Sequence, residues 1–180
     1  VPVFPEKQMK TLIEKAKLSG ILGNKHSSGE EIIKEFGEKH LNNGCPIVYT
    51  SADSVLQIAA HEHIIALDRL YKTCEIAAEI FDELRVQRII ARPFLGEKKD
   101  NFFRTENRKD FISPPPIDTL CDKVIQAGKR CFGIGKIADI FGHRGISESI
   151  SGMSDDKLFD EMLNVIEKAK TGDLIFANFV

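Results

Sequence analysis

Apolar residues recur at the spacing of a helix in several stretches of the chain. Met9, Leu12, Ile13 and Ala16 fall at i, i+3, i+4 and i+7, which predicts a helix over residues 6–17. Residues 27–31 predict the start of a second helix, with a serine cap and an acidic first turn, and residues 42–44 (Asn-Asn-Gly) predict its end. Further helices are predicted over residues 67–84, 117–128 and 155–170.

Short runs rich in β-branched and aromatic residues lie between these helices and predict strands. They cover residues 46–50, 55–60, 86–91, 130–134 and 173–180. Pro93 is expected to end the third strand, and residues 93–116 are expected to form a long polar connection, which is usually functional. Strands that alternate with helices indicate an α/β (α+β) fold. We expect two layers, a mixed sheet of about four to five strands with helices packed on it.

The composition is that of an ordinary globular protein. Hydrophobic residues make up 42% and charged residues 29% of the chain, and the formal net charge of -2 argues against a broadly basic nucleic-acid-binding protein. No run of about 18 apolar residues suggests a membrane span, and no signal-type segment opens the sequence, so the cytoplasm is the expected location. The four cysteines lie far apart without a C-x-x-C pair and are expected to be free thiols.

Arginine is concentrated in one part of the sequence. Five of the eight arginines fall between positions 85 and 108, although lysine outnumbers arginine seventeen to eight. The guanidinium group is preferred where a planar fork binds a phosphate or carboxylate with two hydrogen bonds. Arg88 and Arg92 are an even number of positions apart, so they share one face of a continuous strand. The cluster predicts a phosphate site; the alternative is a solvated, charged edge strand.

Two other polar segments are weaker candidates for ligand binding. Residues 49–54 form a polar turn between apolar strands, where Ser51, Asp53 and Ser54 are candidates to bind sugar hydroxyls; the alternative is an ordinary Asx or serine turn. The Gly-Ile-Gly-Lys sequence that ends at Lys136 lacks the second half of a P-loop, so a nucleotide P-loop is not expected. A lysine next to glycine at a strand end still suits a phosphate.

The histidines do not indicate a metal site or a catalytic arrangement. His61 and His63 are two positions apart and would point the same way on a strand. A third ligand at matching spacing is not evident, so no metal is assigned, and His61 is expected to be a hydrogen-bonded structural residue. Neither a Ser-His-Asp or Cys-His arrangement nor a G-x-S-x-G motif is evident, so no catalytic residue is assigned in this segment.

Five segments resemble signature sequences of the bacterial phosphopentomutases, in the same order. They are residues 23–29 (GNKHSSG), 49–62 (YTSADSVLQIAAHE), 88–96 (RIIARPFLG), 101–108 (NFFRTENR) and 135–140 (GKIADI). The resemblance extends over nearly the whole chain. It implies membership of the alkaline-phosphatase superfamily and the interconversion of ribose 1-phosphate and ribose 5-phosphate, or the deoxyribose forms, in nucleoside salvage.

The resemblance also implies that part of the enzyme lies outside this sequence. The family's core domain carries a phosphorylatable threonine and two manganese ions held by aspartates and histidines. The resemblance implies that residues 1–22 flank that core, residues 23–172 form the substrate-binding cap domain, and residues 173–180 begin the returning core strand. The sequence lacks an initial methionine and ends on an apolar run, as expected of a piece of a longer protein. The motif around His143 is similar to a core metal motif, but its place in the chain order assigns it no metal.

The family mechanism implies a role for the arginines. A phosphoenzyme donates its phosphoryl group to a sugar monophosphate, and the resulting bisphosphate reorients and returns its other phosphate. The non-reacting phosphate then needs a cationic cradle away from the metals, under a cap that excludes water. The implied residues are Arg88, Arg104, Arg108 and Lys136 for the cradle, Ser51 and Asp53 for the ribose hydroxyls, and Val55 and Ile90 for the apolar wall of the sugar.

Two functions remain open at this point. In the first, the chain is the cap domain of a phosphopentomutase and is inactive without its catalytic core. Its partners are then pentose phosphates and that core, with manganese in the full-length enzyme and none on this segment. In the second, it is a free-standing sugar-phosphate-binding or regulatory module. Neither a nucleic acid nor a membrane is an expected partner. The sequence departs from the family at Lys109, where relatives usually carry histidine, which leaves the role of Lys109 open.

Overall fold

The computed structural model describes residues 2–51, 55–86 and 88–179, and the chain divides into two compact units. Unit 1 spans Val1–Ser113 and unit 2 spans Pro114–Val180. Each unit has its own sheet and hydrophobic core. Both units combine helices with strands, so the predicted mixed α/β class is confirmed, although the strands are divided between two sheets. The predicted ranges 1–22 and 173–180 lie within units 1 and 2, and their assignment to parent domains stays a prediction. In the described residues, no helix has the length and apolar character needed to cross a membrane.

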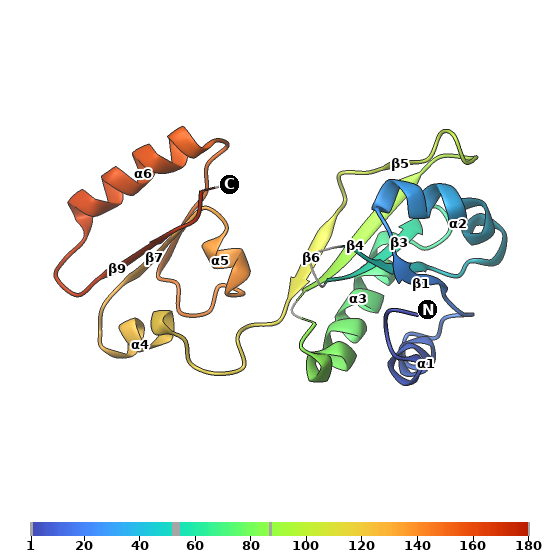
Figure 1. Cartoon of the computed structure of the whole chain (residues 1–180), viewed down its shortest axis with the longest axis horizontal. Helices are drawn as coiled ribbons and strands as arrows, with labels where there is room; N and C mark the ends of the chain where they lie inside the picture. The colour runs from blue at the N-terminus through green and yellow to red at the C-terminus, as the bar shows by residue number, and fades with distance from the viewer. Residues whose placement is uncertain (1, 52–54, 87, 180) are drawn as a thin grey trace. The chain divides into compact units, whose positions relative to one another are not determined.

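Unit 1 is built on one mixed sheet (Figure 1). Its helices are α1 (Glu6–Lys15), α2 (Gly29–Asn43) and α3 (Leu67–Phe81), with a 3-10 turn at Asp82–Leu84. Its strands are β1 (Leu22–His26), β2 (Ile47–Thr50), β3 (Leu56–His61), β4 (Arg88–Leu95), β5 (Phe103–Arg104) and β6 (Lys109–Ile112). The described strands run in the order β1-β2-β3-β4-β5, and β6 also pairs with β4. The β1–β2 and β3–β4 pairs are parallel, and the others are antiparallel.

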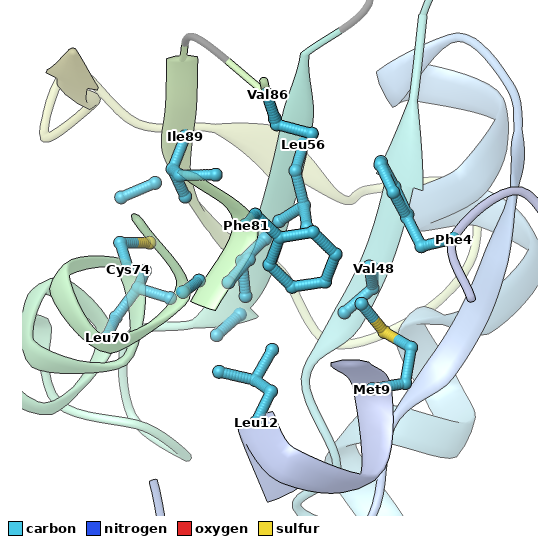
Figure 2. Packing of buried hydrophobic residues seen from close by; sticks show 14 of the residues in the cluster. Phe4, Met9, Leu12, Val48, Leu56, Leu70, Cys74, Phe81, Val86 and Ile89 are labelled. Carbon is cyan, nitrogen blue, oxygen red and sulfur yellow. The ribbon is translucent and has the colours of Figure 1, made fainter. Parts of the chain in front are cut away.

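Helices cover both faces of this sheet, rather than one face as in the expected two-layer arrangement. On the first face, Phe81 of α3 and Leu12 of α1 are fully buried in a core with Leu56 and Ile89 of the central strands. Figure 2 shows these side chains converging between the helices and the sheet. On the opposite face, α2 packs in a second cluster that includes Phe94 of β4. The sheet therefore presents different side chains to α2 and to the α1–α3 pair, by the alternation of strand residues.

The ends of α2 agree with the predicted signals. Ser28 is the N-cap, and its hydroxyl accepts a hydrogen bond from the Glu31 backbone N–H at 3.3 Å. Gly44 follows the helix with a φ of 70°, in the left-handed region that glycine adopts without strain. The capping fixes Gly29 as the first residue of α2.

Unit 2 has a parallel sheet of its own. In the described residues, β7 (Cys131–Ile134) lies between β8 (Glu148–Ile150) and β9 (Leu174–Ala177). The helices are α4 (Leu120–Gln126), α5 (Ile137–Ile140) and α6 (Asp155–Lys168). Leu158 and Val165 of α6 pack against Phe132 and Ile134 of β7, which gives this unit a small core.

Strand β4 continues through Pro93 to Leu95, so the prediction that Pro93 ends it is wrong. Residues 88–91 pair with β6, whereas Phe94 and Leu95 pair with β5. Pro93 falls between these two partner strands, where its missing N–H interrupts no ladder. Its carbonyl accepts the Thr105 N–H at 3.1 Å. Arg92 consequently lies within the strand and not at its end.

The stretch expected to be a long polar connection, residues 93–116, contains β5 and β6. The strands β1 and β8 and the short helix α5 were not predicted either. The sequence of β1, Leu-Gly-Asn-Lys-His, has no apolar alternation, and its residues are only partly buried or exposed. Such elements depend on pairing with a neighbouring strand rather than on a pattern of their own.

Candidate functional site

Four side-chain positions form a row across the sheet of unit 1. Tyr49 of β2 lies opposite Gln57 of β3, Gln57 lies beside Ile90 of β4, and Ile90 lies opposite Asp110 of β6. Ile90 is 2% exposed yet belongs to neither hydrophobic cluster of this unit. It is thus a small apolar floor whose neighbours across the strands are polar.

The alternation of β4 places two arginines beside this floor. Ile89 and Ala91 point into the core with α3, so Arg88, Ile90 and Arg92 occupy the other face of the strand. The prediction that Arg88 and Arg92 share a face is therefore confirmed. With Arg104 of β5 and Arg108, which precedes β6, they make up the group that we call the arginine cluster: Arg88, Arg92, Arg104 and Arg108.

The cluster's hydrogen bonds and ion pairs involve few acceptors. Arg108 binds Asp110 through two hydrogen bonds, each 2.7 Å long. Arg88 Nη1 lies 3.9 Å from the same carboxylate. Arg92 donates from Nε to Gln57 Oε1 at 2.9 Å. Among the described residues, Asp110 is the one carboxylate that pairs with the cluster, so positive charge is in excess on this face.

The pKa values of the side chains at this site reflect the excess of positive charge. Burial lowers the pKa of the Arg92 guanidinium, and the positive charges of Arg108 and Arg104 lower it further. Burial raises the pKa of Tyr49, and the charges of Arg104, Arg92 and Arg108 oppose that rise. The hydrogen bonds to Asp110 raise the pKa of Arg108. Guanidinium groups stay protonated in such settings, so the site keeps its charge and favours an anion.

Arg104 reaches the site over the first residue of α2. A Cβ atom at Gly29 would lie 1.4 Å from Arg104 Nη2 and 2.7 Å from the Tyr49 hydroxyl. The Arg104 guanidinium and the Tyr49 hydroxyl therefore meet above Gly29, in space that any other residue would fill. Glycine is needed here for this close approach and not for an unusual backbone conformation.

The segment between Arg104 and Arg108 is anchored by Glu62, which follows β3. Glu62 Oε1 accepts from the Thr105 hydroxyl at 2.5 Å and from Asn107 Nδ2 at 3.0 Å. One carboxylate oxygen thus holds the turn that carries two arginines of the cluster.

The predicted substrate-binding residues other than Ile90 and the arginines have different outcomes. Ser51 Oγ accepts a hydrogen bond from Gln57 Nε2 at 3.1 Å, which joins it to the row. Val55 is buried, and its carbonyl accepts from the Thr50 hydroxyl at 2.6 Å. Asp53 lies outside the described residues. Lys136 is exposed in unit 2, where it precedes α5, and its place in the cradle stays a prediction.

His40 and His61 serve the structure, as expected for His61. His61 Nε2 lies 3.0 Å from the Gly96 carbonyl, and its Nδ1 accepts the His63 backbone N–H at 3.2 Å. The buried His40 bonds to the Cys45 carbonyl through Nδ1 and accepts the His61 backbone N–H at Nε2. These bonds tie α2 to the ends of β3 and β4.

The Gly-His-Arg sequence at residues 142–144, the motif around His143, is held by ion pairs within unit 2. The Arg144 guanidinium binds Asp118 and Asp122, on either side of the start of α4. His143 lies 3.6 Å from Asp139, one turn earlier in the chain.

Sequence reasoning left Tyr49, Gln57, Arg92 and Asp110 out of the site. Gln57 carried a detectable signal, because a polar residue inside the apolar run VLQIAA needs hydrogen-bond partners when it is buried. Arg92 was recognised as sharing a face with Arg88 but was placed at the strand end because of Pro93. Tyr49 and Asp110 required the strand register, which no local pattern specifies.

The chain is similar over its length to proteins named phosphopentomutase. It is 52% identical over 179 residues to one from Chelativorans sp., 49% over 177 residues to one from Legionella pneumophila, and 48% over 177 residues to one from Rhizobium leguminosarum bv. trifolii. These alignments cover 98–99% of the chain but 43–44% of the relatives, so it spans less than half their length. No family model matches it. Over the segment that it spans, the chain is similar in sequence to the phosphopentomutases.

Proposed function

We propose that this chain is the substrate-binding part of a phosphopentomutase, an isomerase that interconverts ribose 1-phosphate and ribose 5-phosphate or the deoxyribose forms. The observation that carries the proposal is the arginine cluster around buried Ile90 on one face of the unit 1 sheet. The names of the relatives support the reaction. Their greater length supports a parent protein that carries the remaining catalytic machinery.

The chemistry of the site suits one end of a pentose phosphate. A phosphate dianion would bind to the guanidinium groups and compete with Asp110 for Arg108, since both offer paired oxygens to a planar fork. Ile90 would contact the apolar side of the sugar, and Ser51 would bind a sugar oxygen. The site then positions the phosphate that is not being transferred, and such positioning is a main source of rate in phosphoryl transfer.

Manganese enters the proposal through the parent protein only. Among the described residues, no three His, Cys, Asp or Glu side chains come together as a group of metal ligands. We propose that the manganese ions are held by residues elsewhere in the parent.

We place the cap function in unit 1, because the described candidates other than Lys136 lie there. Unit 2 has a feature that supports packing against a further part of the parent protein. Phe159, Leu163 and Ile166 form a second apolar stripe on α6 and are 49%, 46% and 52% exposed. An apolar stripe of this kind on a helix marks an interaction surface.

The test is alanine substitution of Arg88 and Arg108 in the full-length protein. Loss of one charge-assisted bond of about 1.5–3 kcal/mol should lower kcat/KM for ribose 5-phosphate roughly ten- to a hundredfold. Arg108→Lys should recover only part of it, because an ammonium group cannot form the two-bond fork. Arg69→Ala is the matched control, since Arg69 lies on α3 and donates to the Lys17 carbonyl.

Phosphate binding by the arginine cluster and simple pairing with Asp110 predict different results for these variants. If the arginines serve only to pair with Asp110, the alanine variants lose melting temperature and keep the kcat/KM of the folded enzyme. Unchanged kcat/KM in both variants would end the proposal of a phosphate cradle.

A further inference from the structure

The side-chain amide of Gln57 has a fixed orientation. Its Oε1 accepts from Arg92 Nε at 2.9 Å and from the Tyr49 hydroxyl at 3.1 Å. The Arg92 guanidinium is only a donor, so the atom that faces it has to be the amide oxygen. Gln57 Nε2 is then the atom that faces Ser51 Oγ, 3.1 Å away. Gln57 is 3% exposed on the central strand β3, so this arrangement is held by packing as well.

The orientation of Gln57 determines what Ser51 can do. A hydroxyl group has one proton and two lone pairs. Ser51 Oγ uses a lone pair to accept from Gln57, which leaves its proton for another acceptor. Among the described residues, no hydrogen bond uses the Ser51 hydroxyl as donor. A serine held this way at a ligand site presents a donor to the ligand.

Arg92 is held by the same amide. Its Nε is committed to Gln57, so the two Nη nitrogens are the donors that remain for an anion. Within the described part of the chain, Arg92 has no carboxylate partner. Gln57 thus controls one neutral donor and one charged donor on the same face of the sheet.

We propose that Gln57 is a positioning residue for the ligand site: it turns the Ser51 hydroxyl outward as a hydrogen-bond donor to an oxygen of the pentose phosphate and holds Arg92 toward the same ligand. The proposal rests on the proposed function and adds a residue that touches no ligand itself. Tyr49 completes the arrangement by donating its hydroxyl proton to the second lone pair of Gln57 Oε1, whose orientation Arg92 fixes.

The test is a double-mutant cycle between Gln57→Met and Ser51→Ala in the full-length protein, with kcat/KM for ribose 5-phosphate as the readout. Methionine keeps the length of the side chain and removes its hydrogen bonds. A neutral hydrogen bond contributes about 0.5–1.5 kcal/mol, so Ser51→Ala alone should lower kcat/KM about two- to twelvefold. Gln57→Met alone should lower kcat/KM more than Ser51→Ala does, because Arg92 also loses its hydrogen bond to Gln57.

The coupling between the two substitutions tests whether Gln57 acts through Ser51. In the Ser51→Ala background, the loss caused by Gln57→Met should be smaller by about threefold or more, because the part that acts through Ser51 is already gone. Equal losses in both backgrounds would overturn the proposal. Thr73→Val is the control for loss of a buried hydrogen bond, since Thr73 donates to the Arg69 carbonyl at 2.8 Å. It should lower the melting temperature and leave kcat/KM unchanged.

The cycle also separates this proposal from the function on which it rests. A wild-type protein that turns over ribose 5-phosphate but shows no coupling refutes the role of Gln57 alone. A wild-type full-length protein without turnover ends the proposed function and the role of Gln57 with it.

Discussion

A single methyl group at Gly29 should separate ligand binding from folding. A Cβ atom there would lie 1.4 Å from Nη2 and 2.5 Å from Cζ of Arg104, so the guanidinium has to leave its position. Arg104 is exposed, so its side chain can turn into solvent. We therefore expect Gly29→Ala to remove Arg104 from the site without removing its charge from the protein.

The effect on folding should be small because two contributions oppose each other. Replacing glycine by alanine at a helical position stabilises a protein by about 0.4–1 kcal/mol, mainly through the unfolded chain. The new Cβ also approaches the buried Tyr49 hydroxyl to 2.7 Å, so this hydroxyl at the end of the side chain has to shift, which opposes the gain. We expect the free energy of unfolding to change by less than about 1 kcal/mol.

The effect on binding should be larger. Arg104 would offer the phosphate a charge-assisted hydrogen bond, and the loss of about 1.5–3 kcal/mol lowers affinity roughly ten- to a hundredfold. The assay is kcat/KM for ribose 5-phosphate in the full-length protein, with the melting temperature measured on the same samples. Arg104→Ala should give a similar loss, and the double variant should lose no more than either single one. If Gly29→Ala lowers kcat/KM as much in the Arg104→Ala background as in the wild type, its effect does not pass through Arg104 and this reasoning is refuted.

Three further outcomes follow from the structure. Glu62→Ala should raise KM for the pentose phosphate several-fold, whereas Glu62→Gln keeps an acceptor for Thr105 and Asn107 and should retain most of the affinity; equal KM values in both variants would contradict the anchoring role. Burial lowers the pKa values of His40 and His61 below the value of about 6.5 in an unfolded chain, so protons bind the unfolded state more readily and the free energy of unfolding of unit 1 should fall as the pH drops below 6.5. The decrease should be at most about 1.4 kcal/mol per pH unit for each histidine, and denaturant midpoints at pH 7.5 and 5.5 would measure it. The 180-residue chain alone should show no turnover of ribose 5-phosphate with or without manganese, and turnover above a blank preparation would contradict the assignment of catalysis to other parts of the parent.

The helices were predictable because their signals are local. The stripe Met9–Leu12 and the caps Ser28 and Gly44 each lie within a few residues of the element they define, and α1 and α2 begin or end within two residues of the predicted positions. Strand β4 was predicted too short because the effect of Pro93 depends on which strand lies beside it. A proline between two partner strands loses nothing, and only the register reveals that position.

The site was predictable in composition but not in arrangement. The excess of arginine between residues 85 and 108 indicated phosphate chemistry, and the even spacing of Arg88 and Arg92 gave their common face. Arg104 and Arg108 join them only because β5 and β6 both pair with β4, at neighbouring positions along that strand. Without that pairing, the segment between them reads as a mobile loop, and a loop does not determine which arginines converge.

Helix α2 carries a sequence signal for its tertiary contacts, because it contains two glycines, Gly29 and Gly37. Glycine in a helix interior costs about 1 kcal/mol relative to alanine, so its presence calls for a reason. A Cβ at Gly37 would lie 2.4 Å from the Phe102 ring, just as one at Gly29 would meet Arg104. Phe102 packs against Phe94 in the second core, and Arg104 follows it by two residues, so both point to the same side of the segment. Gly37 therefore leaves room for the partly buried Phe102 ring and Gly29 leaves room for the Arg104 guanidinium. At the interior position Gly37 the helix gives up stability so that the segment carrying Arg104 can approach α2 closely.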